Sequence, residues 1–152
     1  MSETNLRIPI RYVDGYVPRL KVTDIGDWID VYAWPNTEEV HIAKGDIFDI
    51  PLGFAMELPE GYEAYLAPRS STPTKFHIGC ANSFGIIDNS YAGDNDIWCF
   101  RAIALEDTVI KKSDRIGQFR IQKRQPHIEF VEVDHLEKED RGGLGSTGNG
   151  VL

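Results

Sequence analysis

The sequence predicts an all-β domain, a jelly-roll-like β-barrel, with at most one or two short helical turns. Three observations support this prediction: apolar and polar residues alternate in several short runs, turn signals rich in glycine, proline and aspartate separate those runs, and no segment keeps a helical period. Many short strands joined by regular turns are typical of antiparallel barrels and sandwiches. Because no linker interrupts the pattern, we expect residues 1–152 to form a single domain.

The individual elements follow from local patterns. Apolar residues alternate in four runs that we expect to be half-buried strands: residues 6–12, 50–58, 62–66 and 128–130. The run from Ile97 to Leu105 is nearly all apolar apart from Arg101, which predicts a strand covered on both faces. Ser70-Ser71-Thr72-Pro73 offers a hydroxyl cap before a proline, which predicts one short helical turn.

Charge and hydropathy exclude several classes of protein. The net charge of −8 argues against a general nucleic-acid binder, although one nucleotide needs only a few local donors. No apolar run approaches the length of about 18 residues that a membrane span requires. The first residues lack the basic and apolar regions of a secretory signal, so we expect a cytoplasmic protein.

Cys80 and Cys99 are the only cysteines in the chain. Their spacing matches no zinc site, and a reducing compartment disfavours a disulfide between them. We therefore expect two small, buried core residues.

The segment from Gly85 to Asp94 places a carboxylate where chemistry is possible. Asp88 ends an apolar strand-like run and precedes Tyr91 by three residues. An aspartate at a strand end can act as a general base if it is partly desolvated and reaches a water molecule. Tyr91 offers a flat apolar face beside it, and Asn82 offers paired donor and acceptor groups to a base edge. Taken alone, a simple turn aspartate is the more common role.

Three further segments could bind phosphate. In Pro68-Arg69-Ser70-Ser71, an arginine and two hydroxyls at a strand-to-turn junction suit phosphate as well as they suit a surface turn. In Arg115-Ile116-Gly117-Gln118, Ile116 is expected to pack inward, and Gln118 could donate to phosphate or simply be exposed on a strand. The glycine-rich tail from Arg141 to Gly148 could wrap a triphosphate or be a disordered polar tail.

Together and in this order, the segments resemble the motifs of the dUTPase family, the trimeric dUTP diphosphatases. The third motif of the family runs asparagine, glycine, two apolar residues, aspartate, two variable residues, tyrosine and glycine. The matching positions are Asn82, Gly85, Ile86, Ile87, Asp88, Tyr91 and Gly93. The resemblance implies that Asp88 activates the water attacking the α-phosphorus, and that Tyr91 packs under the deoxyribose. It also implies that Asn82, with the backbone near Gly85 and Ile87, reads uracil.

The other motifs imply further contacts. The resemblance assigns phosphate contacts to Arg69, Ser70, Ser71 and Gln118. It makes Asp30 in the first motif a support for the site network, although a purely structural aspartate is equally open. It also implies a flexible, glycine-rich arm at about residues 141–152 that closes over the site. The arm residues implied to contact substrate are Arg141, Leu144, Gly145, Ser146 and Thr147.

The sequence departs from the family pattern in two places. The fifth motif is two residues shorter than usual, and Leu144 stands where the family has a phenylalanine that stacks on uracil. Trp98 and Phe100, close in sequence to the third motif, are candidate substitutes for that ring. The first motif carries Trp28 before its aspartate, which weakens that match.

The resemblance implies a homotrimeric enzyme that hydrolyses dUTP to dUMP and pyrophosphate. Its active sites would be shared between subunits, and Mg²⁺ would be held mainly by substrate phosphates and water, without direct protein ligands. Two alternatives stay open. A dCTP deaminase-type relative would need an extra acidic residue near the base, and neither Asp94 nor Asp96 clearly fits. A nucleotide-sensing regulatory protein of the same fold would instead bind a protein partner. No nucleic-acid or membrane partner is expected.

Overall fold

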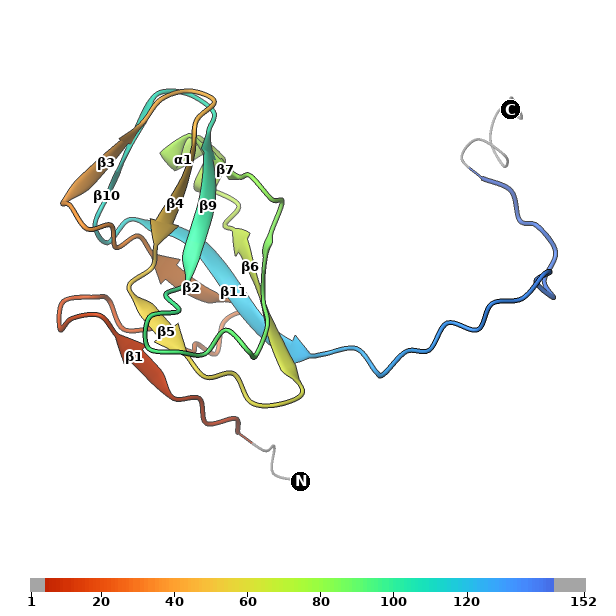
Figure 1. Cartoon of the computed structure of the whole chain (residues 1–152). Coiled ribbons are helices and arrows are strands. Elements are labelled where there is room, and N and C mark those ends of the chain that lie inside the picture. Colours follow the sequence, from red (N-terminus) through yellow and green to blue (C-terminus); the bar gives the residue numbers. More distant parts are fainter. Residues whose placement is uncertain (1–4, 144–152) are drawn as a thin grey trace.

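The computed structural model describes residues 5–143 and is built from short antiparallel strands with one short helix, α1 (Thr72–Phe76) (Figure 1). The strands are β1 (Ile10–Tyr12), β2 (Ile29–Tyr32), β3 (Glu39–Ile42), β4 (Ile47–Pro51), β5 (Phe54–Met56), β6 (Tyr62–Pro68), β7 (Ile78–Cys80), β8 (Gly85–Ile87), β9 (Cys99–Ala104), β10 (Thr108–Lys111) and β11 (Arg115–Lys123). The prediction of an all-β fold with a single helical turn is confirmed.

The strands form four small sheets around a common core. The largest has the order β2-β11-β6-β8, and a three-stranded sheet has the order β4-β9-β7. Two further pairs, β1-β5 and β3-β10, complete the set, and all strand pairs are antiparallel. Neighbours in the sheets are distant in sequence, so each sheet brings together segments from different parts of the chain.

An aromatic cluster fills the centre of the core. Trp98 lies with its ring centroid 5.3 Å from that of Phe54 and 5.1 Å from that of Phe119. Only 1% of Trp98 is exposed, and Phe100 is completely buried. Neither ring can therefore reach a base that binds at the surface of this chain. The suggestion that they replace the missing lid phenylalanine is wrong.

The run from Ile50 to Leu58 is divided between two strands rather than forming one. Gly53 separates β4 from β5 with a φ of +81°, a conformation that side-chain-bearing residues rarely adopt. A Cβ atom at this position would lie 2.9 Å from the Val17 methyl groups. The alternation in residues 62–66 is confirmed as part of β6, whereas residues 6–12 form only the three-residue strand β1.

The strand predicted to be covered on both faces is covered on one. In β9, Phe100, Ala102 and Ala104 are buried, whereas Cys99 and Arg101 are exposed. The expectation that both cysteines are buried is also wrong, since Cys99 is exposed and Cys80 is half-buried. Both thiols are free, as expected.

The predicted helical turn is confirmed, but its cap differs from the expected one. Proline stands at the start of α1, and the Ser71 side chain makes no capping hydrogen bond. Instead the buried hydroxyl of Thr72 accepts a hydrogen bond from the N–H of Arg69 at 2.8 Å. The same hydroxyl donates to the carbonyl of Ile116 on β11 at 2.9 Å. These two bonds fix the turn that follows β6 against the neighbouring strand.

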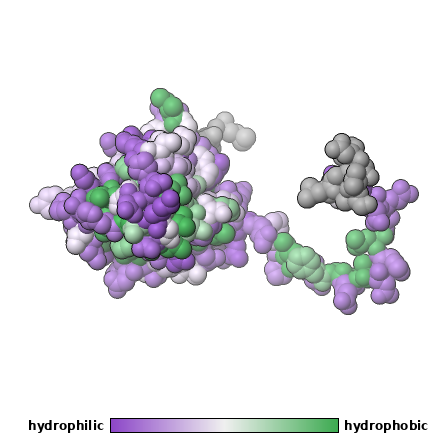
Figure 2. Space-filling model, turned by 90° about the horizontal axis from the view of Figure 1, so that it is seen from above, coloured by the Kyte–Doolittle hydropathy of each residue, from purple (hydrophilic) through white to green (hydrophobic). Residues whose placement is uncertain are grey.

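The segment after β11 leaves the body of the molecule as an extended arm (Figure 1). The strand predicted for residues 128–130 is not formed, because no neighbouring strand pairs with it. Apolar residues on this arm stay in solvent, with Phe130 94% and Leu136 84% exposed (Figure 2). Leu144, Gly145, Ser146 and Thr147 lie outside the described residues. Across residues 5–143, no helix has the length and apolar character to cross a bilayer.

Candidate functional site

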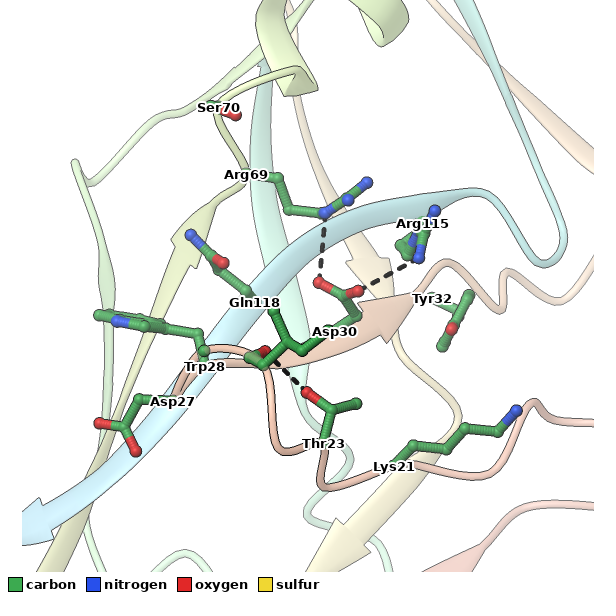
Figure 3. Close-up of a pocket in the computed structure, with 12 residues that line it drawn as sticks. Lys21, Thr23, Asp27, Trp28, Asp30, Tyr32, Arg69, Ser70, Arg115 and Gln118 are labelled. Carbon is green, nitrogen blue, oxygen red and sulfur yellow. Dashed lines mark hydrogen bonds and ion pairs between the residues drawn. The ribbon is translucent and has the colours of Figure 1, made fainter.

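A cationic pocket of about 510 Å³ opens on the sheet β2-β11-β6-β8 (Figure 3). At its centre the carboxylate of Asp30 lies between two arginines, 3.2 Å from Nε of Arg69 and 3.3 Å from an Nη of Arg115. These side chains come from β2, the turn after β6 and the start of β11. One carboxylate therefore holds two guanidinium groups in place at the junction of three chain segments.

A β-bulge in β11 explains how Arg115 and Gln118 reach the same pocket. The pairing of β11 with β2 shifts register between Arg115 and Gly117. Ile116 and Gly117 are both buried there, so the flanking side chains turn outward together. A Cβ atom on Gly117 would lie 3.1 Å from the carbonyl oxygen of Ala67, so only glycine fits comfortably. The inward packing predicted for Ile116 is confirmed.

The remaining wall of the cationic pocket is largely polar, with the aromatic rings of Trp28 and Tyr32. Gln118 donates from its amide nitrogen to the carbonyl of Pro68 at 3.1 Å, and Ser70 is exposed at the rim (Figure 3). Lys21 lines the pocket and forms no ion pair within residues 5–143. Trp28 also lines it, and the Arg120 guanidinium lies 5.8 Å from the centre of its ring. An excess of basic side chains over carboxylates makes this pocket suited to an anionic ligand.

A second pocket of about 560 Å³ lies beside β8, and we call it the β8 pocket. It gathers the five residues predicted from the third motif, which are Asn82, Gly85, Ile87, Asp88 and Tyr91. The structure thus brings together the aspartate, the aromatic ring and the asparagine that the sequence singled out.

Local hydrogen bonds orient the side chains of the β8 pocket. The carboxylate of Asp88 accepts a hydrogen bond from the N–H of Ser90 at 2.8 Å. Tyr91 donates from its hydroxyl to the carbonyl of Ile97 at 2.9 Å, which fixes its ring. Asn82 accepts a hydrogen bond from the Cys80 thiol at 3.0 Å, which leaves its amide nitrogen free to donate into the pocket.

The electrostatics of Asp88 are those of a solvated carboxylate. The hydrogen bonds from Ser90, backbone first and side chain second, hold the pKa of Asp88 below its ordinary value, and Arg124 adds a smaller effect. In contrast, burial raises the pKa of Tyr91, so its phenol stays protonated and continues to donate. In the single chain, therefore, Asp88 is ionised but is a weak proton acceptor.

The two pockets share no lining residue and lie at opposite corners of one sheet. Asp30 on β2 is level with Ala67 of β6, through the intervening strand β11. Asp88, one residue beyond Ile87 on β8, comes level with Glu63 at the other end of β6. Three strand spacings of about 4.8 Å and four residue steps of about 3.4 Å separate these levels, or about 20 Å in total.

The other predicted site residues are placed as follows. Arg69, Ser70, Gln118 and Asp30 line the cationic pocket. Ser71 is half-buried at the start of α1 and does not line it. Arg141 is exposed on the arm. The structure adds Lys21, Trp28 and Arg115. Arg115 and Trp28 stand inside recognised motifs, whereas Lys21 carried no sequence signal.

Comparison with known proteins identifies the family. A family model described as dUTPase matches residues 29–148. The SPbeta prophage-derived deoxyuridine 5'-triphosphate nucleotidohydrolase YosS of Bacillus subtilis is 53% identical over 143 residues, which is 94% of this chain and 99% of that protein. The chain belongs to the dUTPase family. The deoxyuridine 5'-triphosphate nucleotidohydrolase of Rickettsia bellii is 36% identical over 149 residues, covering 95% of this chain and 97% of that dUTPase.

Solved dUTPase structures share this fold. A dUTPase from phage phi11 of S. aureus, in which a structural Mg(II) ion is coordinated, matches with a TM-score of 0.72 at 17% identity, covering 88% of this chain and 100% of that one. The dUTPase of Staphylococcus bacteriophage 80alpha, with the nucleotide dUPNHPP, matches with a TM-score of 0.71 at 20% identity, covering 93% and 98%. The all-β dUTPase fold predicted from the motifs is confirmed.

Proposed function

We propose that this chain hydrolyses dUTP to dUMP and pyrophosphate. Its membership of the dUTPase family supports this reaction, and so do its relatives, which are deoxyuridine 5'-triphosphate nucleotidohydrolases. The observation that carries the proposal is the gathering of Asn82, Asp88 and Tyr91 around one pocket, together with a separate cationic pocket. The β8 pocket suits a nucleoside, and the cationic pocket suits a triphosphate.

The nucleoside half of the substrate belongs in the β8 pocket. The free amide nitrogen of Asn82 can donate to a carbonyl of uracil, and the backbone near Gly85 and Ile87 offers further polar groups. Tyr91 presents its ring beside Asp88, where it can pack under the deoxyribose and leave no space for a 2′-hydroxyl. These contacts would select a deoxyuridine nucleotide.

The triphosphate half belongs in the cationic pocket. Arg69 and Gln118 supply N–H donors at its centre, and Ser70 supplies a hydroxyl at its rim. Lys21 adds a positive charge from the opposite wall. Because Asp30 already holds Arg69 in position, little side-chain ordering is needed when the phosphates bind.

Asp88 is the residue that we assign to the chemical step. A water molecule attacks the α-phosphorus in line, so that a new oxygen–phosphorus bond forms while the bond to the bridging oxygen of the β-phosphate breaks. Asp88 accepts the proton of the attacking water, and the charge developing on the leaving pyrophosphate is met by the donors of the cationic pocket.

The donor set of this chain is consistent with a Mg²⁺ ion held mainly by the substrate. Within the described part of the chain, no group of three or more histidine, cysteine, aspartate or glutamate side chains could hold a metal by itself. The Asp30 carboxylate is occupied by Arg69 and Arg115. When bound through the phosphates and water, Mg²⁺ would supply charge neutralisation on the triphosphate.

The distance between the two pockets supports a site shared between copies of the chain. Neighbouring phosphorus atoms of a triphosphate are only a few ångström apart, so Asp88 and Arg69 must lie close together around one substrate. In one chain they stand at opposite ends of β6. We therefore propose a homotrimer in which Asp88 of one copy meets the cationic pocket of another. Covering Asp88 would also remove water from it and raise its pKa toward that of a useful base.

The arm supports the same arrangement. Residues 124–143 leave the body of their own chain, and Phe130 and Leu136 are almost completely exposed on them. Ile128, Val131 and Val133 are exposed on the same arm, and such a concentration of exposed apolar side chains marks a contact surface. An arm that packs on a neighbouring copy would bring Arg141 to a neighbouring site.

Pyrophosphate release tests the proposed reaction. We would compare dUTP, dCTP, dTTP and UTP as substrates in the presence of Mg²⁺, for the wild type and for Asp88→Asn. Release from dUTP alone, lost in the variant, is the expected result. Ammonia release from dCTP would favour the deaminase alternative, and no turnover of any nucleotide would favour the regulatory one.

A further inference from the structure

The thiol of Cys80 lies behind Asn82, on the side away from the β8 pocket. Asn82 is among the described residues that line this pocket, whereas Cys80 is not. Cys80 is the last residue of β7, and it is half-buried with its side chain packed against the core. Its thiol donates to the side-chain oxygen of Asn82 at 3.0 Å. Any effect of Cys80 on a nucleotide in the β8 pocket therefore passes through Asn82.

The backbone that carries Asn82 is fixed by main-chain hydrogen bonds on both sides. The N–H of Ala81 donates to the carbonyl of Arg101 on β9 at 2.8 Å. The N–H of Ser83 donates to the carbonyl of Cys80 at 3.0 Å, and Ser83 has a positive φ of 69°, which closes a tight turn. With the main chain held in this way, the freedom that matters is that of the Asn82 carboxamide. A half-turn about its last side-chain bond exchanges the oxygen and the NH₂ group.

The thiol distinguishes the two orientations of this carboxamide. With the oxygen toward Cys80, the S–H has an acceptor and the NH₂ group is directed away from it. In the opposite orientation, the NH₂ group would meet the S–H donor, and the oxygen would be directed at the base. Burial raises the pKa of the Cys80 thiol, and this effect exceeds the lowering by the Asn82 backbone N–H and by the charge of Arg101. The thiol therefore stays protonated at neutral pH and keeps its donor hydrogen.

The orientation of the carboxamide matters because two pyrimidines differ at one position of their edge. Uracil has a carbonyl oxygen at position 4, like thymine, whereas cytosine has an amino group there. A fixed NH₂ donor pairs with the uracil oxygen but meets a second donor in cytosine. The carbonyl at position 2 is common to both bases, so a contact there would not separate them. Rejection through an unpaired polar group is the stronger form of selectivity.

We propose that Cys80 is a positioning residue, which fixes the Asn82 carboxamide with its NH₂ group toward position 4 of the base and so sets the preference of the β8 pocket for uracil over cytosine. This inference rests on the proposed function, because it concerns the specificity of the same site. The sequence predicted only a small core residue at this position. The hydrogen bond to Asn82 adds a specific role to that packing.

Two substitutions of similar size isolate the donor hydrogen. Cys80→Ser keeps a hydrogen-bond donor beside Asn82, whereas Cys80→Ala removes it. We would measure kcat and KM for dUTP and dCTP with Mg²⁺. In Cys80→Ala the ratio of kcat/KM for dUTP to that for dCTP should fall at least about tenfold, mainly through a higher KM for dUTP. In Cys80→Ser the ratio should stay within about threefold of the wild type.

Binding of dUMP and dCMP provides a readout that does not depend on turnover, since neither has a pyrophosphate group to release. Calorimetry should show the same loss of preference in Cys80→Ala and the same rescue in Cys80→Ser. A general loss of stability would weaken the binding of both nucleotides equally and leave their ratio unchanged. Urea unfolding of the two variants measures that loss directly.

A double-variant cycle tests whether Cys80 acts through Asn82. In an Asn82→Ala background the carboxamide is absent, so adding Cys80→Ala should cause no further change in the ratio of dUMP to dCMP affinity. The same fold-change with and without the Asn82 side chain would mean that Cys80 acts by another route and would overturn the inference.

The remaining outcomes separate this inference from the proposed function. If the wild type hydrolyses dUTP in preference to dCTP but Cys80→Ala keeps the wild-type ratio, the inference is overturned and the proposed function stands. If the wild type does not hydrolyse dUTP, yet binds dUMP more tightly than dCMP and loses that preference in Cys80→Ala, the proposed reaction is wrong and the inference stands.

Discussion

The cationic pocket and the β8 pocket are organised in opposite ways. In the cationic pocket the side chains hold one another, since Asp30 contacts both Arg69 and Arg115 and is itself only one-third exposed. In the β8 pocket Asp88 is exposed and is held only by Ser90, two residues away. The single chain thus builds the half that binds charge and leaves the half that carries out the chemistry open to water.

The positions of the strands explain the difference. The cationic pocket stands over β11, which is paired on both sides and carries the bulge that aims Gln118 outward. The β8 pocket stands at a three-residue edge strand. An edge strand has neighbours on one side only, so the residues after it find fewer partners within the chain. A second copy can supply those partners.

The largest effect should come from a substitution in the β8 pocket. Asp88→Asn keeps the size and the turn of the side chain but removes the proton acceptor, so kcat should fall about 10²- to 10⁴-fold with KM little changed. Steady-state kinetics with dUTP measure both constants. Asp94→Asn, a nearby exposed aspartate outside the β8 pocket, is the control and should behave like the wild type. A rise in KM with kcat unchanged would contradict the role given to Asp88.

A smaller loss should follow from opening the cationic pocket. Arg69→Ala removes charge-assisted bonds to phosphate, so kcat/KM for dUTP should fall about 10- to 100-fold. Arg115→Ala should cost less, because Arg115 is more exposed than Arg69. Equal losses in the two variants would mean that the pocket is not organised around Arg69.

The Thr72 hydroxyl, which fixes the turn carrying Arg69, should contribute measurably to the free energy of unfolding. Thr72→Val keeps the shape but removes a buried hydroxyl that bonds both Arg69 and Ile116, which leaves two polar groups without their partner. We expect a loss of about 1–3 kcal/mol in the free energy of unfolding, measured with urea. Thr74→Val removes an exposed hydroxyl that donates to the carbonyl of Ser71, and it should change the free energy of unfolding by less than about 0.5 kcal/mol. Similar losses of unfolding free energy in the two variants would show that the hydrogen bonds of Thr72 stabilise the fold no more than that of Thr74.

The smallest effect concerns acid stability and a residue, Asp14, that lines neither pocket. The N–H of Tyr16 hydrogen-bonds to Asp14 and, with weaker help from Trp34 and Val17, holds the pKa of Asp14 below its ordinary value. The unfolded chain then binds a proton more readily than the folded one, so this contribution is complete above about pH 4 and is lost as pH falls through the lower folded pKa. Asp14→Asn should flatten the acid side of a plot of melting temperature against pH. An unchanged plot would refute the assignment.

Local sequence rules predicted most of the fold. Period-two alternation identified β6, and the Ser71-Thr72-Pro73 segment identified α1, because both signals act within a few neighbouring residues. The same alternation could not tell where a glycine with positive φ would break a run, as Gly53 does between β4 and β5. It also could not predict which aromatic rings meet in the core, and so Trp98 was wrongly named as a candidate for stacking on the base.

The site was predictable where residues lie within one motif. Asn82, Asp88 and Tyr91 meet because one short strand and its turn position all three. Lys21 was not predictable, since it reaches the cationic pocket through a loop without a distinctive pattern. The prediction that β9 is covered on both faces failed, because an apolar run alone does not show which of its faces meets the core, and Cys99 and Arg101 are exposed.

Mixing two impaired variants, each lacking one half of the site, tests the shared site most directly. Asp88→Asn retains a complete cationic pocket, and Arg69→Ala retains a complete β8 pocket. If each site takes Asp88 from one copy and Arg69 from another, co-refolding equal amounts should make about one quarter of the sites complete by random assortment, and dUTP hydrolysis should recover to about a quarter of the wild-type rate. If both residues acted within one chain, no mixture would contain a complete site, and activity would stay at the level of the separate variants.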